Sequence, residues 1–459
     1  MTKSSIASRK KFWKLGIKDF NTQYFDFNKD GDLIAKEGNN VYNIRYLAEK
    51  FGTSLEILFP YIIEERVEDL LDLAASLIKR LKYQGKFFYH YPMKSNQTKE
   101  VVLAMVGEGA NLETASYNEL YIVKKMLEQE SFNEKIRILC NGPKTDKYIN
   151  LIDELQHRGL KVIPIIEGPM ELKTFQNSKY DVGIRLDVPV KSKLNWNKQI
   201  DRFGFSRKEL LKMSSFKNLK VLHYRIGKIE KPADIIETTK YALNVFFELK
   251  KTNPSLDTID IGGGMPIPFE RNKKYSAEKV LEKLFELLKK EAEKRGVSHP
   301  NLICEWGRYM VAPAQITIFK VIDTKRIANK GVDAKKWYVI DGSLMNDLID
   351  TWALNQKWFV APVKSRPDTK LNDVWISGSS CDSDDVYTGI DGSVTLPDYD
   401  YDANDLFYIV FFDTGAYQDA LASHHCMLSS PIKIIAENGH IVVARKRETP
   451  EEVGKEFGW

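Results

Sequence analysis

The amino-acid sequence predicts an α/β protein in which a parallel (β/α)8 barrel precedes a β-rich domain. Between residues 61 and 315, short apolar strands alternate eight times with amphipathic helices, which is the pattern of a closed parallel barrel. After residue 315, short strands follow one another across turns with few long helices between them. We therefore expect a barrel over 61–315, a β-rich domain over 316–459, and an N-terminal segment, 1–60, that packs with the β-rich domain.

Apolar runs of strand length occur at eight places in the barrel region. They are residues 87–93, 110–113, 136–141, 161–167, 181–186, 220–226, 258–262 and 301–307. Helical spacing of apolar residues predicts helices over 67–81, 116–127, 146–157, 235–250 and 277–295. Nearly every strand ends in charged or glycine residues, and the active sites of parallel barrels lie at the carboxyl ends of the strands.

The β-rich region has six further apolar runs of strand length. They are residues 316–321, 336–340, 375–378, 406–412, 432–435 and 440–444. An acidic run, 391–405, is expected to form a surface loop, and the N-terminal segment is expected to add a strand to this domain.

Charge and cysteine content exclude several classes of protein. The 68 basic and 63 acidic residues are interspersed and leave a net charge of only +5, so we expect no nucleic acid partner. No run approaches the roughly 18 apolar residues of a membrane span, and the N-terminus lacks the apolar core of a signal peptide. Four cysteines, far apart and without a CxxC motif, predict a reduced, cytoplasmic protein.

The stretch FFYHYPMKSNQ places a single lysine, Lys94, at the carboxyl end of the first barrel strand. Aromatic neighbours that partly desolvate an ammonium group favour the free amine, which can attack a carbonyl to form an imine. A lysine that merely extends from a strand end to water is the alternative. The residues at the other strand ends bear on this choice.

Two further strand ends carry residues suited to an anionic, ring-shaped ligand. In IDIGGG, the glycines Gly262, Gly263 and Gly264 can bring backbone N–H groups against a phosphate, although a glycine run also makes a simple tight turn. In CEWGRYMVAP, Glu305 can keep a pyridine nitrogen protonated and Arg308 can bind phosphate. A salt bridge on a loop is the alternative for this second pair.

The β-rich region contributes two more candidate groups. In GSSCDSDDVY, Cys381 adjoins Asp382, Asp384 and Asp385, and this negative charge should raise the pKa of the thiol, which suits a proton donor. The same carboxylates can recognise a cation, and an acidic loop with an incidental cysteine is the alternative. In FFDTGAYQ, the hydroxyl of Tyr417 can reach an anion or can belong to a core tyrosine.

Six motifs in this order resemble the fold-type III pyridoxal-phosphate decarboxylases, which include ornithine, diaminopimelate and biosynthetic arginine decarboxylases. They are PMKSNQ, LCNG, IDIGGG, CEWGRYMVAPA, SSCDSDDVY and DTGAYQ, and the resemblance spans roughly residues 40–440. PMKSNQ, CNG and CDSDD are most similar to the biosynthetic arginine decarboxylases. The resemblance implies an alanine racemase-like fold, in which a (β/α)8 TIM barrel binds pyridoxal 5'-phosphate and a β-rich domain follows.

The resemblance also implies a role for each candidate residue. Lys94 forms the imine with the cofactor, Glu305 pairs with the pyridine nitrogen, Glu113 and Arg185 line the cofactor, and Gly264, Arg308 and Tyr417 hold its phosphate within the turn that Gly262 and Gly263 begin. Cys381 is the acid that reprotonates the substrate, while Asp382, Asp384 and Asp350 bind its distal cation. Cys381 and Asp382 come from the partner subunit, which implies a homodimer with shared active sites. No metal site is expected.

Two positions depart from the family pattern. In LHYRIGK, Arg225 stands where a histidine usually stacks on the cofactor ring, and Lys228 stands in place of a small serine. A guanidinium can also stack on a ring and a lysine can reach a phosphate, so Arg225 remains a candidate cofactor-binding residue.

The sequence favours decarboxylation of arginine to agmatine in polyamine biosynthesis, because the aspartates after Cys381 suit a purely cationic substrate end. Ornithine, lysine and diaminopimelate are the alternative substrates. Two other classes remain open: a non-catalytic, decarboxylase-like regulator, supported only by Arg225 and Lys228, and a different reaction on the same fold, such as racemisation.

Overall fold

The computed structural model describes residues 5–18, 20, 22–129, 136–188, 202–213, 215–227, 232–267 and 276–459. Lys228 therefore lies outside the described residues. The chain divides into two compact units, one of Glu64–Pro266 with Tyr275–Met310, the other of Met1–Ile63, Ile267–Lys274 and Val311–Trp459. Each unit is described by itself below.

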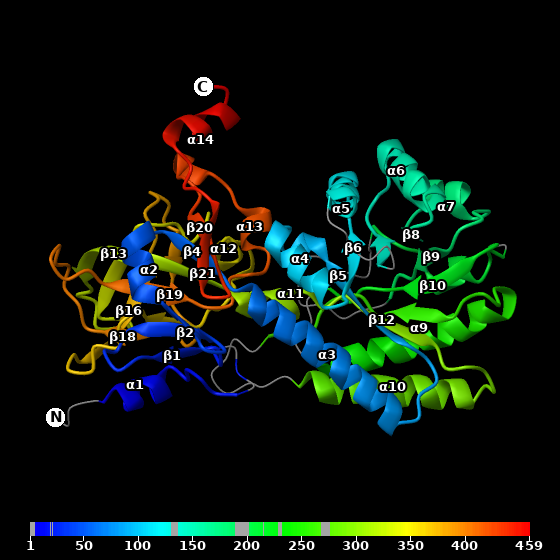
Figure 1. The fold of residues 1–459 in the computed structure, drawn as a ribbon, viewed down its shortest axis with the longest axis horizontal. Coiled ribbons are helices and arrows are strands. Elements are labelled where there is room, and N and C mark those ends of the chain that lie inside the picture. Colours follow the sequence, from blue (N-terminus) through cyan, green and yellow to red (C-terminus); the bar gives the residue numbers. More distant parts are fainter. Residues whose placement is uncertain are drawn as a thin grey trace. The chain divides into compact units, whose positions relative to one another are not determined.

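The unit that begins at Glu64 is a closed barrel of eight parallel strands, as the sequence predicts (Figure 1). Around the barrel the strand order is β10-β11-β12-β5-β6-β7-β8-β9, so the chain visits neighbouring strands in turn. The strands are β5 (Phe87–Pro92), β6 (Asn111–Thr114), β7 (Arg137–Cys140), β8 (Lys161–Ile166), β9 (Val182–Arg185), β10 (Leu219–His223), β11 (Thr258–Asp260) and β12 (Asn301–Cys304).

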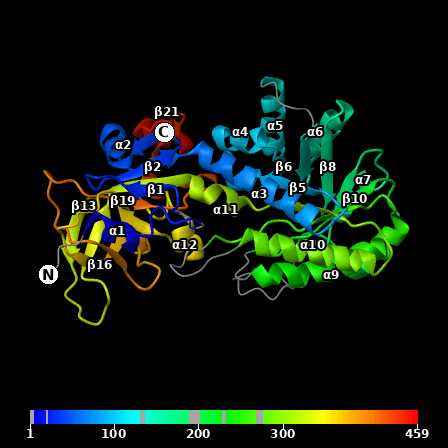
Figure 2. The same cartoon turned by 60° about the horizontal axis from the view of Figure 1, so that its bottom comes forward.

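Helices connect successive strands of the barrel, and two more precede its first strand and follow its last. They are α3 (Pro60–Arg80, most of which belongs to this unit), α4 (Lys99–Gly107), α5 (Tyr117–Gln129), α6 (Asp146–His157), α7 (Pro169–Phe175), α8 (Arg207–Leu210), α9 (Pro232–Thr252), α10 (Ala277–Glu293) and α11 (Gly307–Val311), and a short 3-10 helix, η1 (Met93–Ser95), follows β5. Figure 2 shows α9 and α10 lying side by side, in agreement with their contacts. The apolar stripe of α10 is buried, from Val280 to Leu288.

The interior of the barrel explains why polar side chains gather at one end of it. Leu139, Ile163, Val221 and Ile303 form one buried cluster although they come from four different strands, which places them inside the barrel. Side chains two residues apart on a strand point to the same face. The residues that follow these core positions at the strand ends therefore face the same interior, at the carboxyl end.

The other unit is built on a ten-stranded sheet and a three-stranded sheet. Its elements are α1 (Ile6–Phe12), β1 (Phe25–Phe27), β2 (Leu33–Glu37), β3 (Asn40–Asn43), α2 (Ile44–Phe51), β4 (Leu55–Leu58), η2 (Ala312–Ala314), β13 (Gln315–Arg326), β14 (Lys336–Ile340), α12 (Asp350–Leu354), β15 (Val360–Pro362), β16 (Leu371–Ser377), β17 (Val386–Tyr387), β18 (Val394–Pro397), β19 (Tyr408–Phe411), α13 (Gln418–Leu421), η3 (His425–Met427), β20 (Ile432–Glu437), β21 (His440–Arg445) and α14 (Pro450–Glu456).

The main path of the larger sheet runs β17-β16-β14-β13-β4-β20-β21. In it, β4 from the N-terminal segment pairs antiparallel with β13 and parallel with β20. The long strand β13 also pairs with β14 and β19, so it joins both halves of the sheet. The hydrophobic core of this unit includes Phe319, Tyr338, Trp358 and Phe411, which are all buried.

The expectation of a plain surface loop over the acidic run 391–405 is wrong. Residues Val394–Pro397 form β18, which pairs antiparallel with β16. Leu396 is fully buried, because two apolar residues at alternate positions are enough to dock this short strand against the sheet. The flanking aspartates hide that signal in the sequence.

Candidate active site

A hydrogen-bonded network links four strand ends of the barrel. Lys94, in η1 directly after β5, forms an ion pair with Glu113 of β6. Asn141, which follows β7, donates from Nδ2 to Glu113 Oε1 at 2.9 Å and to Glu305 Oε1, after β12, at 3.0 Å. The side chain of Glu113 is fully buried, while that of Lys94 retains 27% exposure. The lysine is thus held on a buried carboxylate and still has access to solvent.

Close backbone packing sets the position of Lys94. At Gly307, the first residue of α11, an added Cβ would lie 2.0 Å from Ser95 Oγ and 2.7 Å from Pro92 Cγ. A glycine is therefore required for the loop after β12 to approach the turn that carries the lysine. The sequence EWGR brings Glu305 and Arg308 to this turn because Gly307 stands between them.

The glycine run Gly262–Gly264 likewise allows close packing, here against the backbone of Glu305. Gly262 has a positive φ of 63°, and a Cβ on Gly263 would lie 2.9 Å from the carbonyl oxygen of Glu305. The N–H of Gly262 donates to Asp260 Oδ1 at 2.9 Å, and its carbonyl accepts from the N–H of Glu305 at 2.9 Å. Both polar groups of Gly262 thus bind protein atoms, which leaves Gly263 and Gly264 as the candidates for contact with an anion.

Three buried titratable groups meet beside this turn. His223, Asp260 and Glu305 each place one nitrogen or oxygen within 4.8 Å of the others. His223 Nε2 lies 3.7 Å from Glu305 Oε1, beyond hydrogen-bond distance. Neither ring nitrogen of His223 has a hydrogen-bond partner among the described residues, and the same holds for Asn141 Oδ1.

Burial dominates the electrostatics of the cluster. Burial, together with the charge of Glu113, raises the pKa of Glu305 to about 7, although Lys94 and Arg225 oppose this. Burial and the neighbouring Glu305 raise the pKa of Asp260 well above its usual value. The negative charge of one buried carboxyl thus disfavours ionisation of its neighbour. Burial also lowers the pKa of His223, which keeps its ring neutral.

Arginines at two further strand ends contribute positive charge. Arg185, at the end of β9, donates to Glu167 Oε1 at 2.7 Å and lies over the ring of Phe203 at 5.0 Å from its centre. Arg225, after β10, is exposed, and its charge lowers the pKa of both Glu305 and His223. Arg308, the second residue of α11, is half-buried.

The remaining predicted site residues belong to the other unit, and all of them except Asp384 lie in or contact one segment, 417–427. Tyr417 precedes α13, and the next residue, Gln418, donates from Nε2 to Asp350 Oδ2 at 3.1 Å. At the far end of the segment, Cys426 Sγ lies 3.7 Å from Cys381 Sγ. His425 Nε2 lies 3.5 Å from Asp382 Oδ2.

The acidic residues near Cys381 differ in their surroundings. Asp385 is fully buried and accepts from the backbone N–H of Leu344 at 2.7 Å, so its role is structural. The side chain of Asp382 accepts from the N–H of Asp384 at 2.9 Å and is partly exposed. Asp384 is exposed, whereas Asp350 is buried. Among the described aspartates of this group, Asp350, Asp382 and Asp384 remain candidates for binding a cation.

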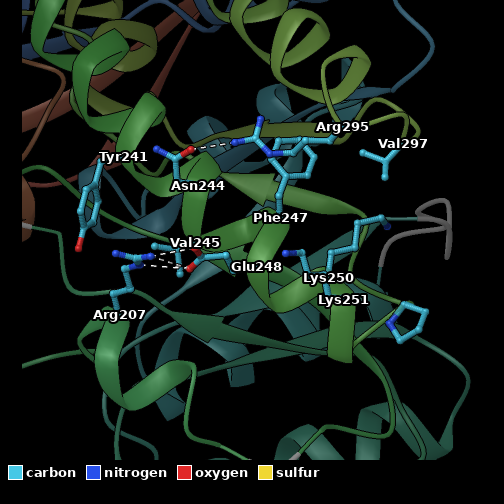
Figure 3. Close-up of a pocket in the computed structure, with 11 residues that line it drawn as sticks. Arg207, Tyr241, Asn244, Val245, Phe247, Glu248, Lys250, Lys251, Arg295 and Val297 are labelled. Carbon is cyan, nitrogen blue, oxygen red and sulfur yellow. Dashed lines mark hydrogen bonds and ion pairs between the residues drawn. The ribbon is translucent and has the colours of Figure 1, made fainter.

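A separate cavity of about 840 Å³ lies among the helices outside the barrel, lined mainly by α9 and the residues around the end of α10 (Figure 3). Both of its arginines are already engaged. Arg207 pairs with Glu248 at 2.8 Å, and Arg295 donates to Asn244 Oδ1 at 3.0 Å. The cavity contains none of the predicted site residues.

The structure is a closed parallel barrel with a charged, buried cluster at the carboxyl ends of its strands. Enzymes with such barrels have their active sites at this end. Residues 70–312, more than half of the chain, match the family described as pyridoxal-dependent decarboxylase, pyridoxal binding domain. The chain belongs to this family, and pyridoxal phosphate is its cofactor. Among the described residues, no helix has the length and apolar composition needed to cross a membrane.

Individual relatives agree with this assignment. The biosynthetic arginine decarboxylase of Prochlorococcus marinus strain MIT 9215 is 28% identical over 381 residues, which cover 74% of this chain and 58% of the relative. The chain thus matches little more than half the length of that relative. Among solved structures, the biosynthetic arginine decarboxylase of Campylobacter jejuni has a TM-score of 0.78 at 21% identity, covering 93% of this chain and 89% of that one.

The diaminopimelate decarboxylase of M. jannaschii has a TM-score of 0.77 at 23% identity, covering 95% of this chain and 98% of that one. At these identities the two solved structures establish the same fold, a barrel with a β-rich domain, and leave the substrate open.

The strand-end residues fit the cofactor of the family. The imidazole of His223 and Asn141 Oδ1 are buried polar atoms without a hydrogen-bond partner among the described residues, which is typical of a site that receives a polar ligand. Glu305 is a buried carboxyl at a strand end, a group suited to pairing with the pyridine nitrogen of the cofactor.

Sequence reasoning assigned no role to Asn141, His223 or Asp260. The available signal was strand alternation, since Asn141 and His223 stand two residues after the core residues Leu139 and Val221.

Proposed function

We propose that the protein is a pyridoxal-phosphate-dependent decarboxylase of a basic amino acid, with arginine, converted to agmatine for polyamine biosynthesis, as its substrate. The observation that carries the proposal is the network in which Lys94, Glu113, Asn141 and Glu305 meet at the carboxyl ends of four barrel strands. When bound, the cofactor supplies an aldehyde that condenses with amines and a ring that accepts the electron pair left by departing carbon dioxide.

The residues of the barrel would hold and tune this group. Lys94 would bind it covalently, with Glu113 accepting a proton from the lysine ammonium to which it is paired. Glu305 would face the ring nitrogen and keep it protonated, with Asn141 fixing the orientation of the carboxylate. Gly263, Gly264, Arg308 and Tyr417 would contact the phosphate, and Arg185 and Arg225 would line the ring.

Residues of the β-rich unit would act on the substrate. Cys381 would donate a proton to the substrate carbon after carbon dioxide leaves. Its hydrogen-bonding contact with Cys426 raises the pKa of the Cys381 thiol, and this keeps the proton in place at neutral pH. Asp350, Asp382 and Asp384 would surround the distal guanidinium with negative charge.

A homodimer follows from the proposal, because Cys381 and Asp382 of one protomer would complete the site that contains Lys94 of its partner. Mixing the inactive variants Lys94→Ala and Cys381→Ala tests this sharing. Partial recovery of activity in the mixture supports shared sites, since some mixed dimers then contain one intact site. An inactive mixture whose chains are shown to exchange would contradict it. The free state of all four cysteines is in keeping with a cytoplasmic enzyme.

Product analysis tests the reaction and the substrate together. The protein, loaded with pyridoxal phosphate, is incubated with equal amounts of arginine, ornithine, lysine and diaminopimelate, and the amines formed are measured by mass spectrometry. We expect agmatine as the main product and none from Lys94→Ala. If another amine is the main product, the amino acid from which it forms is the substrate and arginine is not. Release of D-amino acids without any amine would contradict decarboxylation.

A further inference from the structure

The β-rich unit contains two solvent-exposed thiols in contact. Cys381 Sγ and Cys426 Sγ lie 3.7 Å apart although the two residues are 45 positions apart in sequence. Both cysteines are exposed, whereas Cys140 and Cys304 are fully buried. A disulfide requires the sulfurs to approach to about 2 Å. The contact therefore needs a shift of less than about 2 Å to become a covalent bond.

Both cysteine loops are anchored to the same short segment, 342–347. On the Cys381 side, the N–H of Ser379 donates to the carbonyl of Gly342 at 2.9 Å, and Asp385 accepts from the N–H groups of Leu344 at 2.7 Å and Ser380 at 3.2 Å. A Cβ on Gly378 would overlap the carboxylate of Asp385, so the approach of this loop depends on a glycine.

On the Cys426 side, the buried side chain of Asn346 makes three hydrogen bonds to the loop. Asn346 Nδ2 donates to the carbonyl of His425 at 3.0 Å, and Asn346 Oδ1 accepts from the N–H of His425 at 3.2 Å and from Ser423 Oγ at 3.1 Å. Because one segment is hydrogen-bonded to both loops, the fold brings the two sulfurs together.

We propose that Cys381 and Cys426 form a redox-sensitive thiol pair, which hydroperoxides convert to an intramolecular disulfide and which thiols restore. A hydroperoxide transfers an oxygen atom to one thiol, giving a sulfenic acid and releasing water or an alcohol. The second thiol attacks that sulfur, the S–O bond breaks, and water leaves as the S–S bond forms. Two electrons pass from the sulfur pair to the peroxide bond, so the balance is complete.

The consequence for catalysis rests on the proposed function of Cys381. A disulfide has no S–H bond, so oxidation removes the proton that Cys381 would donate to the substrate carbon. Cys426 also protects its neighbour, because a sulfenic acid captured as a disulfide is not oxidised further to the irreversible sulfinic acid. Formation of the disulfide would thus stop catalysis reversibly and protect Cys381 from irreversible oxidation.

The test compares the full-length wild-type protein with Cys426→Ser after treatment with hydrogen peroxide. Peptide mapping by mass spectrometry, which requires neither cofactor nor activity, should find Cys381 joined to Cys426 in the wild type, with Cys140 and Cys304 still reduced as internal controls. Dithiothreitol should restore both thiols. In Cys426→Ser, Cys381 should instead accumulate as the sulfinic acid, which dithiothreitol does not reduce.

Activity is measured on the same samples. Oxidised wild type should lose about 100-fold in decarboxylation rate, the contribution of a general acid, and recover with dithiothreitol, while Cys426→Ser should lose activity without recovery. Two free thiols after peroxide, or disulfides between different chains, would overturn the thiol pair. A Cys381–Cys426 disulfide with undiminished activity would leave the pair intact and contradict the proposed role of Cys381.

Discussion

Replacement of Glu305 by glutamine should stabilise the cofactor-free protein at alkaline pH. The pKa of this carboxyl rises from an ordinary 4.5 to about 7 because the folded protein buries it near Glu113. A carboxyl with a higher pKa in the folded state binds its proton more tightly when folded, so stability is lost as pH rises from 4.5 to 7. At about 1.4 kcal/mol for each tenfold change in proton affinity, the loss is about 3 kcal/mol.

Glu305→Gln removes the titrating group and keeps the oxygen that accepts from Asn141 Nδ2. Urea unfolding of the cofactor-free protein at pH 5 and pH 8 measures the effect. Through this group the wild type should lose about 3 kcal/mol of unfolding free energy between these values, and the variant should lose correspondingly less. Glu286→Gln, the same change at an exposed position of α10, is the control and should follow the wild type. Equal pH dependence of all three proteins would refute the burial argument.

Two further predictions follow from packing and charge. Gly307→Ala should lower the unfolding free energy by about 1–3 kcal/mol and weaken cofactor binding, because the added Cβ would lie 2.0 Å from Ser95 Oγ. Urea unfolding and a cofactor titration measure the two effects. Unchanged values would show that the turn adjusts to the added methyl group without cost. Asp382→Asn should raise the KM for arginine about tenfold with a smaller effect on kcat, since one charge facing a guanidinium is worth about 1–2 kcal/mol. Steady-state kinetics with arginine and with the uncharged analogue citrulline measure it, and an equal loss for both would argue against charge recognition.

Much of the fold could be predicted because each barrel strand has a recognisable pattern in its own stretch of sequence. An apolar run of a few residues, a polar end and an amphipathic helix repeat eight times, and the structure closes the eight runs into one barrel. The strand β18 is hidden in the acidic stretch, because Val394 and Leu396 give only two apolar positions and their docking depends on pairing with a separate strand, β16.

The candidate site could be predicted in its members but not in its contacts. Motifs and alternation identify Lys94, Glu113 and Glu305 as residues at strand ends. Distances across the barrel decide that Asn141 bridges two of them and that Asp260 lies beside Glu305. The same is true of the β-rich unit, where the contact between Cys381 and Cys426 depends on two loops that meet at one segment.

The most direct test of the account is the chemical fate of Lys94 in the presence of the cofactor. The protein is incubated with pyridoxal phosphate, reduced with borohydride and digested, and the peptides are analysed by mass spectrometry. We expect the phosphopyridoxyl group on the peptide containing Lys94, together with loss of an absorbance band at the edge of the visible range, and no such label in Lys94→Ala. Label spread over exposed lysines, with Lys94 unmodified, would contradict the account.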